Sequence, residues 1–512
     1  MSRKAKNGNG NGKKHATQQS VNSAIKSICD IMRRSNCAGA MQYVPELTWI
    51  LFLRILDERE HREAEESKAV GQSFTPSLEA PYRWRDWAAP GSQKRVELHE
   101  NGALGDFFAF VNQQLLPYLK VFADRPNTLP RQKVISQIMS GVERVRIDTE
   151  RNLLDVLDKV NEISAETVDD THVFTLSQVY EGLLLKMGEK GNDGGQFFTP
   201  REVIRALIQV VDPKVGDTIY DPGCGTGGFL AQSFEYMTGS NNAKITAPEE
   251  LDTLKHGTFY GREKENLIYP IALANLVLHG IDQPNLWHGN TLTGSEIYGG
   301  LFREAPPLYD VVLTNPPFGG KEGKDAQTRF AYKTGSTQVL FLQHVIDSLK
   351  HGGRCGIVLD EGVLFRTNET AFAQTKRKLL DDCNLWCIVS LPPGAFVNAG
   401  AGVKTNLLFF TKGGPTERVW YYDLSDRKVG KKNPLTVADF KDFFELLSTR
   451  ADSDRSWTVT RDQIDGKNYD LKAVNPNAKS DEDTRTPGEL LDFIDAKSRE
   501  IETALAELRK PT

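Results

Sequence analysis

The sequence predicts an α/β protein in which a mostly parallel, doubly wound sheet follows a helical N-terminal domain and precedes a helical tail. The helical part is indicated by apolar stripes such as Val21, Ile25 and Ile28, and no convincing strand alternation appears before about residue 170. Beyond that point apolar strands alternate with helical stretches, which is the order that parallel sheets require. Ligands of such a sheet bind beyond the carboxyl ends of its strands.

Changes in composition along the chain predict four regions. Residues 1–18 combine Gly and Asn with five Lys or Arg side chains and no acid, so we predict a disordered basic tail. Residues 19–170 are predicted to form the helical domain and residues 171–420 the α/β domain. Residues 421–512 are predicted to form a C-terminal region that ends in an amphipathic helix.

The composition is that of an ordinary globular chain with no global attraction to nucleic acid. A chain of 512 residues, 39% hydrophobic and 26% charged, predicts several domains. A net charge of −5 argues against a free-standing DNA-binding protein but suits a subunit whose partner grips the DNA. No apolar run approaches the roughly 20 residues that span a bilayer, so we expect no membrane contact. The six cysteines lack the spacing of a metal site, so we expect no metal, reduced thiols and a cytoplasmic location.

A glycine-rich turn follows the first predicted strand of the sheet, in the segment DPGCGTGG that begins at Asp221. Gly223 and Gly225 let the backbone turn tightly and approach a ligand. The segment lacks the G-x-x-x-x-G-K-[ST] pattern of nucleoside triphosphate sites. An acidic loop repels phosphates but suits a ligand with an ammonium and a sulfonium group. We therefore predict S-adenosylmethionine as the cofactor.

Two flanking segments supply further candidate cofactor contacts. The next strand ends at Glu263, whose carboxylate can accept hydrogen bonds from both ribose hydroxyls, with Glu265 as the rival candidate. The long spacing from the glycines requires residues 238–256 to be an inserted loop. Upstream, Thr199 and Pro200 suit the cap and first turn of a helix. Free N–H groups at that helix end could receive the cofactor carboxylate, although the pair could also be only a cap.

The segment NPPF at residues 315–318 ends a buried strand in a stiff corner, because two prolines fix the backbone and remove N–H donors. The side-chain carbonyl of Asn315 and the backbone carbonyl of Pro316 can each accept one hydrogen of an exocyclic amine. That arrangement aims the nitrogen lone pair at an electrophilic methyl group. Phe318 offers a face on which a flat base can stack, worth roughly 1–3 kcal/mol. The corner therefore predicts methyl transfer to an exocyclic amine.

The order of these parts resembles the N6-adenine DNA methyltransferases, and more fully the modification subunit of type I restriction–modification systems. The resemblance is carried by GGQFFTPREV, DPGCGTGGFL, YGREKEN, LTNPPFGG, LPPGAF and GVKTNLLFFTKGG. It implies a Rossmann-like, S-adenosylmethionine-dependent methyltransferase sheet. The implied cofactor contacts are Thr199, Asp221, Gly223, Gly225 and Glu263, and the target adenine would be held by Asn315, Pro316 and Phe318.

Two further site residues follow from the resemblance. Phe396, in LPPGAF, is a candidate second wall of a base sandwich, with a role in the core as the alternative. Asn290 takes a strand-end position where many relatives place an acid against the adenine of the cofactor. An amide can still form a hydrogen bond there.

The resemblance also implies partners. In this family the target adenine is flipped out of duplex DNA, and a separate specificity subunit, clasped by two modification subunits, reads the sequence. A restriction endonuclease subunit is implied in the same way. Only about 95 residues follow the sheet, which is too few for two target-recognition modules. A helical seam for docking on a partner, or on the chain's own domain, is formed by Leu491, Ile494, Ser498, Ile501, Leu505 and Leu508.

Other interpretations of the same corner stay open. The Asn-Pro-Pro-aromatic arrangement also serves methylation of glutamine amides in proteins and of guanine or adenine in RNA. Those enzymes rarely carry a large helical N-terminal domain together with a coiled tail. A non-catalytic scaffold with a decayed cofactor pocket is disfavoured because Asp221, the loop glycines, Glu263 and Asn315 are all intact.

Overall fold

The computed structural model describes residues 18–35, 40–162, 199–239, 242–296, 305–396, 402–430, 433–477 and 486–508. The predicted basic tail lies outside these ranges except for its last residue, Gln18. In the ranges that are described, no helix has both the length and the apolar character needed to cross a membrane.

The N-terminal region is helical, as predicted, and residues 18–35 and 40–162 contain no strand. Its main helices bury apolar stripes; in α8, Leu153, Val156 and Leu157 are buried, and the Thr149 hydroxyl caps the first turn by accepting from Asn152 N. The elements are α1 (Gln18–Arg34), α2 (Ala40–Ala69), α3 (Trp84–Trp87), α4 (Gln93–Arg95), η1 (Val96–Glu100), α5 (Asp106–Phe110), η2 (Val111–Leu115), α6 (Leu116–Lys120), η3 (Val121–Asp124), α7 (Pro130–Met139) and α8 (Glu150–Asn161).

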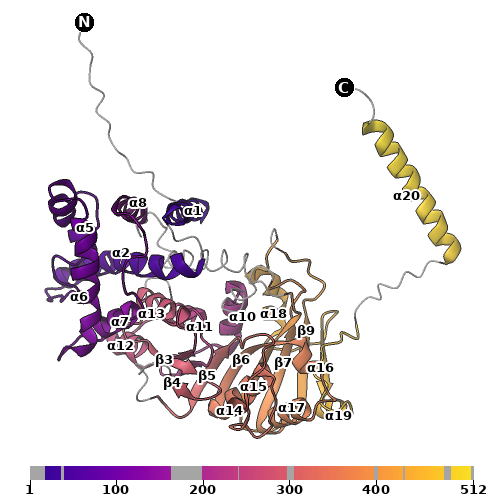
Figure 1. Ribbon diagram of the computed structural model, residues 1–512. Helices are drawn as coiled ribbons and strands as arrows, with labels where there is room; N and C mark the ends of the chain where they lie inside the picture. The colour runs from indigo at the N-terminus through magenta and orange to yellow at the C-terminus, as the bar shows by residue number, and fades with distance from the viewer. Residues whose placement is uncertain are drawn as a thin grey trace.

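One ten-stranded sheet follows, which confirms the predicted α/β class (Figure 1). Its strands are β1 (Ile219–Asp221), β2 (Phe259–Glu263), β3 (Asn285–Asn290), β4 (Ser295–Glu296), β5 (Tyr309–Thr314), β6 (Leu349–Asp360), β7 (Cys383–Ser390), β8 (Thr405–Lys412), β9 (Arg418–Asp423) and β10 (Ser456–Thr460). Their order is β10-β9-β7-β8-β6-β5-β1-β2-β3-β4. The pairs from β3 through β2, β1 and β5 to β6 are parallel, and antiparallel pairs flank them.

The sheet continues past residue 420, where the α/β domain was predicted to end. That position lies inside β9, which pairs in parallel with β7, and β10 adds an antiparallel edge strand. β9 is held by aromatic packing on both faces: Tyr421 stacks on Trp457 at 5.3 Å between ring centroids, and Trp420 stacks on Phe443 at 5.8 Å. The predicted inserted loop at 238–256 also differs, because its second half forms α12 (Pro248–His256).

Helices cover both faces of the sheet, so its strands are buried on both sides. One face packs on α10 (Arg201–Val211), α11 (Gly228–Thr238) and α13 (Ile268–Leu278), and the other on α15 (Thr337–Ser348) and α17 (Thr370–Asp382). Alternate residues of β8 divide between the two cores, with Phe409 in one and Phe410 in the other. The remaining helices are α14 (Lys324–Gln327), α16 (Glu361–Phe365), η8 (Val437–Phe440), α18 (Lys441–Leu446), α19 (Arg461–Asp465) and α20 (Pro487–Leu508).

α13 joins the helical region to the sheet. Every residue of α13 except Pro270 is buried, and the helix packs on α2, α7 and α11. A helix that is apolar on all sides requires such complete cover. In Figure 1, α1, α2 and α8 lie above α13 and α11, which in turn lie above the sheet, and α7 lies beside α13. The helical region is therefore packed directly onto the helix that follows β2.

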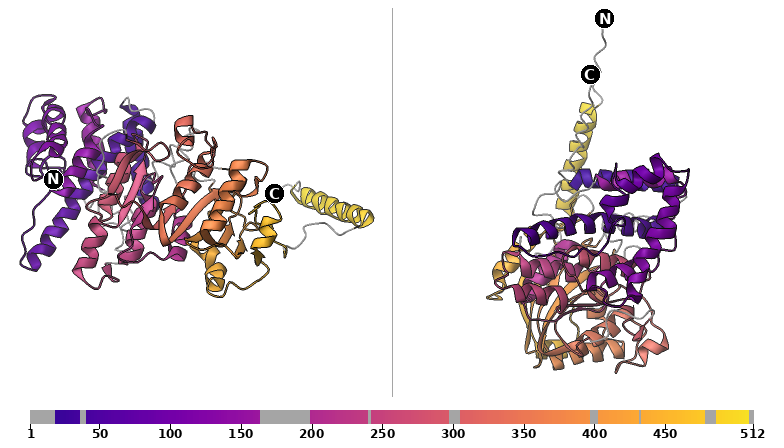
Figure 2. Two further views of the ribbon diagram at one scale, coloured as in Figure 1. Left: turned by 90° about the horizontal axis from the view of Figure 1, so that it is seen from below. Right: turned by 90° about the vertical axis from the view of Figure 1, so that its left-hand side faces the viewer.

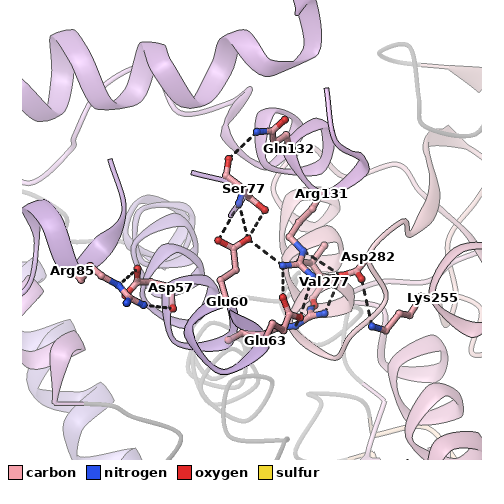
Figure 3. Close-up of polar contacts among 11 residues, drawn as sticks. Asp57, Glu60, Glu63, Ser77, Arg85, Arg131, Gln132, Lys255, Val277 and Asp282 are labelled. Atoms are coloured by element: carbon pink, nitrogen blue, oxygen red, sulfur yellow. Dashed lines mark hydrogen bonds and ion pairs between the residues drawn. The ribbon is translucent and has the colours of Figure 1, made fainter. Parts of the chain in front are cut away.

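A cluster of charged side chains fixes this packing (Figure 3). Arg131 of α7 binds Glu60 at 3.1 Å and Glu63 at 2.8 Å, both from α2, and Asp282 at 2.8 Å, from the loop after α13. Arg59 of α2 also binds Asp282, at 2.9 Å. Burial opposes ionisation of Asp282, but Arg59 and Arg131 outweigh it and lower the pKa of that carboxyl. The cluster therefore ties two N-terminal helices to the α/β part of the chain.

α20 stands apart from the other described elements in Figures 1 and 2. The predicted seam is exposed along it as far as Leu505, with Leu491 at 64%, Ile494 at 57% and Ile501 at 60% exposure, while the side chain of Leu508 lies outside what the structure describes. The structure therefore shows an amphipathic helix whose apolar side no described part of this chain covers.

We expect Arg131→Met to lower the free energy of unfolding by about 3 kcal/mol, because it leaves three largely buried carboxylates without their shared cation. Thermal unfolding followed by circular dichroism measures the loss. The exposed pair Lys441–Glu445, at 3.8 Å, supplies the control, and Lys441→Met should cost less than about 1 kcal/mol. Equal losses in the two variants would mean that the cluster contributes no more than a surface ion pair.

Candidate active site

A cavity of about 240 Å³ opens at the carboxyl ends of β1, β2, β3 and β5. It lies where the strand order reverses, between β1 and β5, which is the usual ligand position in a doubly wound sheet. The predicted site residues that line it are Gly223, Gly225, Glu263, Asn290, Asn315 and Phe318. The other predicted site residues, which are not part of the lining, are Thr199, Pro200, Asp221, Pro316 and Phe396.

The glycine turn is held by hydrogen bonds to Asp221, the last residue of β1. Its carboxylate accepts from Gly223 N at 3.1 Å and from the Thr314 hydroxyl at 2.7 Å. Gly225 and Gly227 have φ of 52° and 80°, and a Cβ on Gly227 would lie 3.3 Å from Leu276. The turn therefore needs glycine for its conformation and for its contact with α13. Asp221 shapes the turn, while Gly223 and Gly225 face the cavity.

Glu263, at the end of β2, links its own strand to the glycine turn. One carboxylate oxygen accepts from Gly225 N at 3.0 Å and the other from Glu265 N at 2.8 Å. The side chain is buried yet lines the cavity, and each oxygen keeps a lone pair for a ligand. Glu265, the rival candidate, also lines the cavity but is partly exposed and lies 3.7 Å from Lys264. The geometry favours Glu263.

Burial raises the pKa of both acids. The pKa of Asp221 rises to about 7, although hydrogen bonds from Thr314 and Gly223 oppose the shift. The pKa of Glu263 also rises to about 7, through burial first, and the nearby charge of Glu265 adds to the shift. The site therefore concentrates acidic groups that titrate near neutral pH, which suits a ligand with hydroxyl donors and positive charge.

Asn290 is the last residue of β3, where sequence reasoning placed it. Its Oδ1 accepts from Leu292 N at 2.9 Å and Thr293 N at 3.3 Å, so the side chain shapes the turn after the strand. The neighbouring Thr291 hydroxyl donates to the Pro222 carbonyl. These bonds join the β3 turn to the glycine turn, and they leave the Asn290 NH2 group as the part that can meet a ligand.

The proline corner begins at Asn315, directly after β5. Asn315 Nδ2 donates to Thr199 Oγ1 at 2.9 Å, whereas Asn315 Oδ1 is buried and has no hydrogen-bond partner in the part of the chain described. A buried acceptor without a partner is costly unless a ligand satisfies it. Within the described ranges, the Pro316 carbonyl receives a single long contact, 3.5 Å, from Gln338 Nε2. Two carbonyl oxygens with free acceptor capacity therefore belong to the corner.

Phe318 and Phe396 do not stand apart as two parallel walls around a base. Phe318 and Phe396 contact each other edge to face, with 5.3 Å between ring centroids and 89° between planes. Phe396 is 1% exposed and belongs to the core, whereas Phe318 lines the cavity. No base fits between rings at that distance, so the predicted sandwich requires the two rings to separate.

Sequence reasoning missed residues that support the site. Thr314 is the partner of Asp221, and Asn275 of α13 donates to the Thr226 carbonyl at 2.8 Å. A polar residue in an otherwise apolar strand or helix is the signal that could have found both. Gln338 also accepts from Asp360 N at 3.2 Å, and nothing in its local sequence marks that role.

Comparison with known proteins gives consistent matches. A family model described as N-6 DNA Methylase matches residues 171–485, and one described as HsdM N-terminal domain matches residues 21–142. The type I restriction enzyme EcoEI methylase subunit of Escherichia coli is 34% identical and covers 96% of this chain and 97% of that protein. The type I restriction enzyme EcoKI methylase subunit of Escherichia coli K12 is 30% identical, over 86% of this chain and 81% of that protein. A solved structure from work on assembly and conformational transition of a type I R-M system matches with TM-score 0.70 and 36% identity, over 96% and 98%.

Proposed function

The chain belongs to the N6-adenine DNA methylase family as a type I restriction–modification methylase subunit, and from that membership we propose how its site works. It is an adenine-N6-specific DNA methyltransferase that depends on S-adenosylmethionine. The comparisons favour this function over the glutamine, RNA and scaffold alternatives. The assignment of its catalytic corner is carried by one observation, the buried Oδ1 of Asn315, which has no hydrogen-bond partner among the described residues.

The cavity residues fit S-adenosylmethionine. The Glu263 carboxylate would accept from the ribose hydroxyls, and the Asn290 amide would contact the adenine of the cofactor. The cofactor carboxylate would lie at the start of α10, beside Thr199 and Pro200, where backbone N–H groups favour an anion. When bound, the cofactor supplies a methyl group that a positively charged sulfur makes electrophilic. Asp221 would act through the glycine turn that it holds.

The corner would orient the target amine. Asn315 Oδ1 and the Pro316 carbonyl would each accept one hydrogen of the adenine N6 group, because both retain free lone pairs. Acceptors in this position direct the nitrogen lone pair and stabilise positive charge that develops on nitrogen. The methylated nitrogen is acidic enough to lose its extra proton to water, so the corner needs no strong base.

The target adenine would stack on Phe318. Entry of the base into this corner requires extrusion from the duplex, because the N6 group is otherwise paired. Phe396 would become the second wall only if the Phe318 ring moves off it, since the rings are now in contact. Base entry and separation of the two rings would therefore occur together.

The proposed partners follow from membership in a restriction–modification complex. A net charge of −5 leaves DNA gripping and sequence reading to a specificity subunit, which would bind two copies of this chain. A restriction endonuclease subunit would join the same cytoplasmic complex. The exposed seam of α20 would dock on helices of the specificity subunit, because an amphipathic helix gains stability when its apolar side is covered.

We expect Asn315→Ala to lower kcat by at least about 100-fold, because it removes one of two acceptors that stabilise developing charge. The dissociation constant for S-adenosylmethionine should stay within a few-fold, since the cofactor contacts lie on other residues. Methyl transfer by the complex with the specificity subunit and calorimetry on the same sample measure the two quantities. Wild-type turnover in this variant would refute the role of the corner.

We expect S-adenosylmethionine to bind more tightly as pH rises from 6 to 8. The pKa of Glu263 is raised to about 7, and only its ionised form can accept from both ribose hydroxyls, so the competent fraction grows across this range. Calorimetric titration at several pH values tests this. Glu263→Gln should weaken binding and flatten the pH dependence. Glu265→Gln should not weaken binding, and it should move the pH dependence to lower pH, because it removes a charge that raises the pKa of Glu263. A larger effect from Glu265→Gln would reassign the ribose contact.

We expect N6-methyladenine in DNA when the chain is co-expressed with its specificity subunit, and almost none when it is expressed alone. The variant Ile494→Gln with Ile501→Gln should resemble the chain alone, because it removes apolar contacts from the seam. Asp492→Gln with Thr503→Gln, on the opposite side of α20, is the control. Co-purification and mapping of methylated adenine measure both steps. Wild-type assembly of the seam variant would exclude docking through this helix.

A further inference from the structure

The amide of Asn315 is held at one end only. Nδ2 donates to Thr199 Oγ1 at 2.9 Å, and Oδ1 has no partner among the described residues although it is buried. The two side chains come from positions 116 residues apart, because Thr199 lies just before α10 and Asn315 just after β5. The contact therefore leaves Oδ1 as the amide atom that still needs a hydrogen-bond donor, and Asn315 is one of the residues that line the cavity.

The neighbouring polar side chains are engaged elsewhere. The Thr314 hydroxyl donates to Asp221 at 2.7 Å. Gln338 has its Nε2 on the Pro316 carbonyl and its Oε1 on Asp360 N. The orientation of the Asn315 amide therefore depends on the Thr199 hydroxyl.

We propose that Thr199 is a positioning residue for methyl transfer, whose hydroxyl holds the Asn315 amide so that Oδ1 rather than the NH2 group faces the target amine. The proposal rests on the function proposed above. The two orientations of an amide fill the same space and differ only in their hydrogen bonds. A rotated amide would point N–H donors at an amine whose own hydrogens also need acceptors, and the corner would lose one of its two acceptors.

The single proton of the Thr199 hydroxyl gives this contact a direction. If that proton is donated to the cofactor carboxylate at the start of α10, the oxygen can only accept from Asn315. Occupancy of the cofactor site would then select the productive orientation of the amide. Thr199 would therefore affect the rate at saturating cofactor, and not only the affinity for the cofactor.

The test compares Thr199→Val, which keeps the shape but loses the hydroxyl, with Thr199→Ser, which keeps the hydroxyl. Both are assayed in the complex with the specificity subunit, with kcat and the KM for S-adenosylmethionine determined separately. We expect Thr199→Val to lower kcat about 10-fold at saturating cofactor, the size of one hydrogen bond, and Thr199→Ser to stay within about 2-fold of wild type. Thr199→Ala, expected to match Thr199→Val, serves if the valine variant does not fold.

Two results would overturn the proposal. If Thr199→Val raises only the KM and keeps the wild-type kcat, Thr199 is a cofactor ligand and nothing more. If Thr199→Ser loses as much kcat as Thr199→Val, the hydroxyl is not the cause. Asn315→Ala separates this inference from the proposed function: a fully active Asn315→Ala variant refutes the corner itself, whereas an inactive one beside a wild-type kcat in Thr199→Val refutes only the positioning role.

Discussion

The site depends on the hydrogen bond that Thr314 donates to Asp221 across the neighbouring strands β5 and β1, at 2.7 Å. Both side chains are buried, so breaking the bond would leave a buried carboxylate with only the N–H of Gly223 among its described partners. The bond sets the end of β5 level with the end of β1. The proline corner and the glycine turn consequently share one rigid frame, and Glu263 extends that frame to β2.

The ends of these strands also carry buried polar groups that would be unfavourable if their only role were to stabilise the fold. Asp221 and Glu263 are buried acids whose pKa values lie near 7, and Asn315 Oδ1 is a buried acceptor that no described residue satisfies. Each costs stability in the unliganded chain. The cost is concentrated within a few residues of one cavity, and the apolar cores on both faces of the sheet can offset it.

The sequence predicted most of the frame because local chemistry marked it. The acid and glycines of 221–225, and the strand that ends at Asn315, are short-range patterns with a mechanical meaning. Contacts between segments that are distant in the chain have no comparable local sequence pattern. The bond between Thr199 and Asn315, the packing of Phe396 on Phe318, and the interdomain role of Arg131 arise only when the chain is folded. β9 was cut by a predicted boundary because its stabilising partners, such as Trp457, lie far along the chain.

Because α13 is apolar on every side, recombination could not move the methyltransferase sheet to another protein without the helices that cover α13. A fragment beginning near residue 199 would uncover the surface of α13 that α2 and α7 now shield, and such a patch drives aggregation. An exchange of N-terminal helices between related subunits would have to carry a matching α13 and the acid at Asp282. In a viable chimaera, α13 would therefore have to come from the same parent as the N-terminal helices that cover it. The junction would fall within the α/β part of the chain and not at the connection between the two regions.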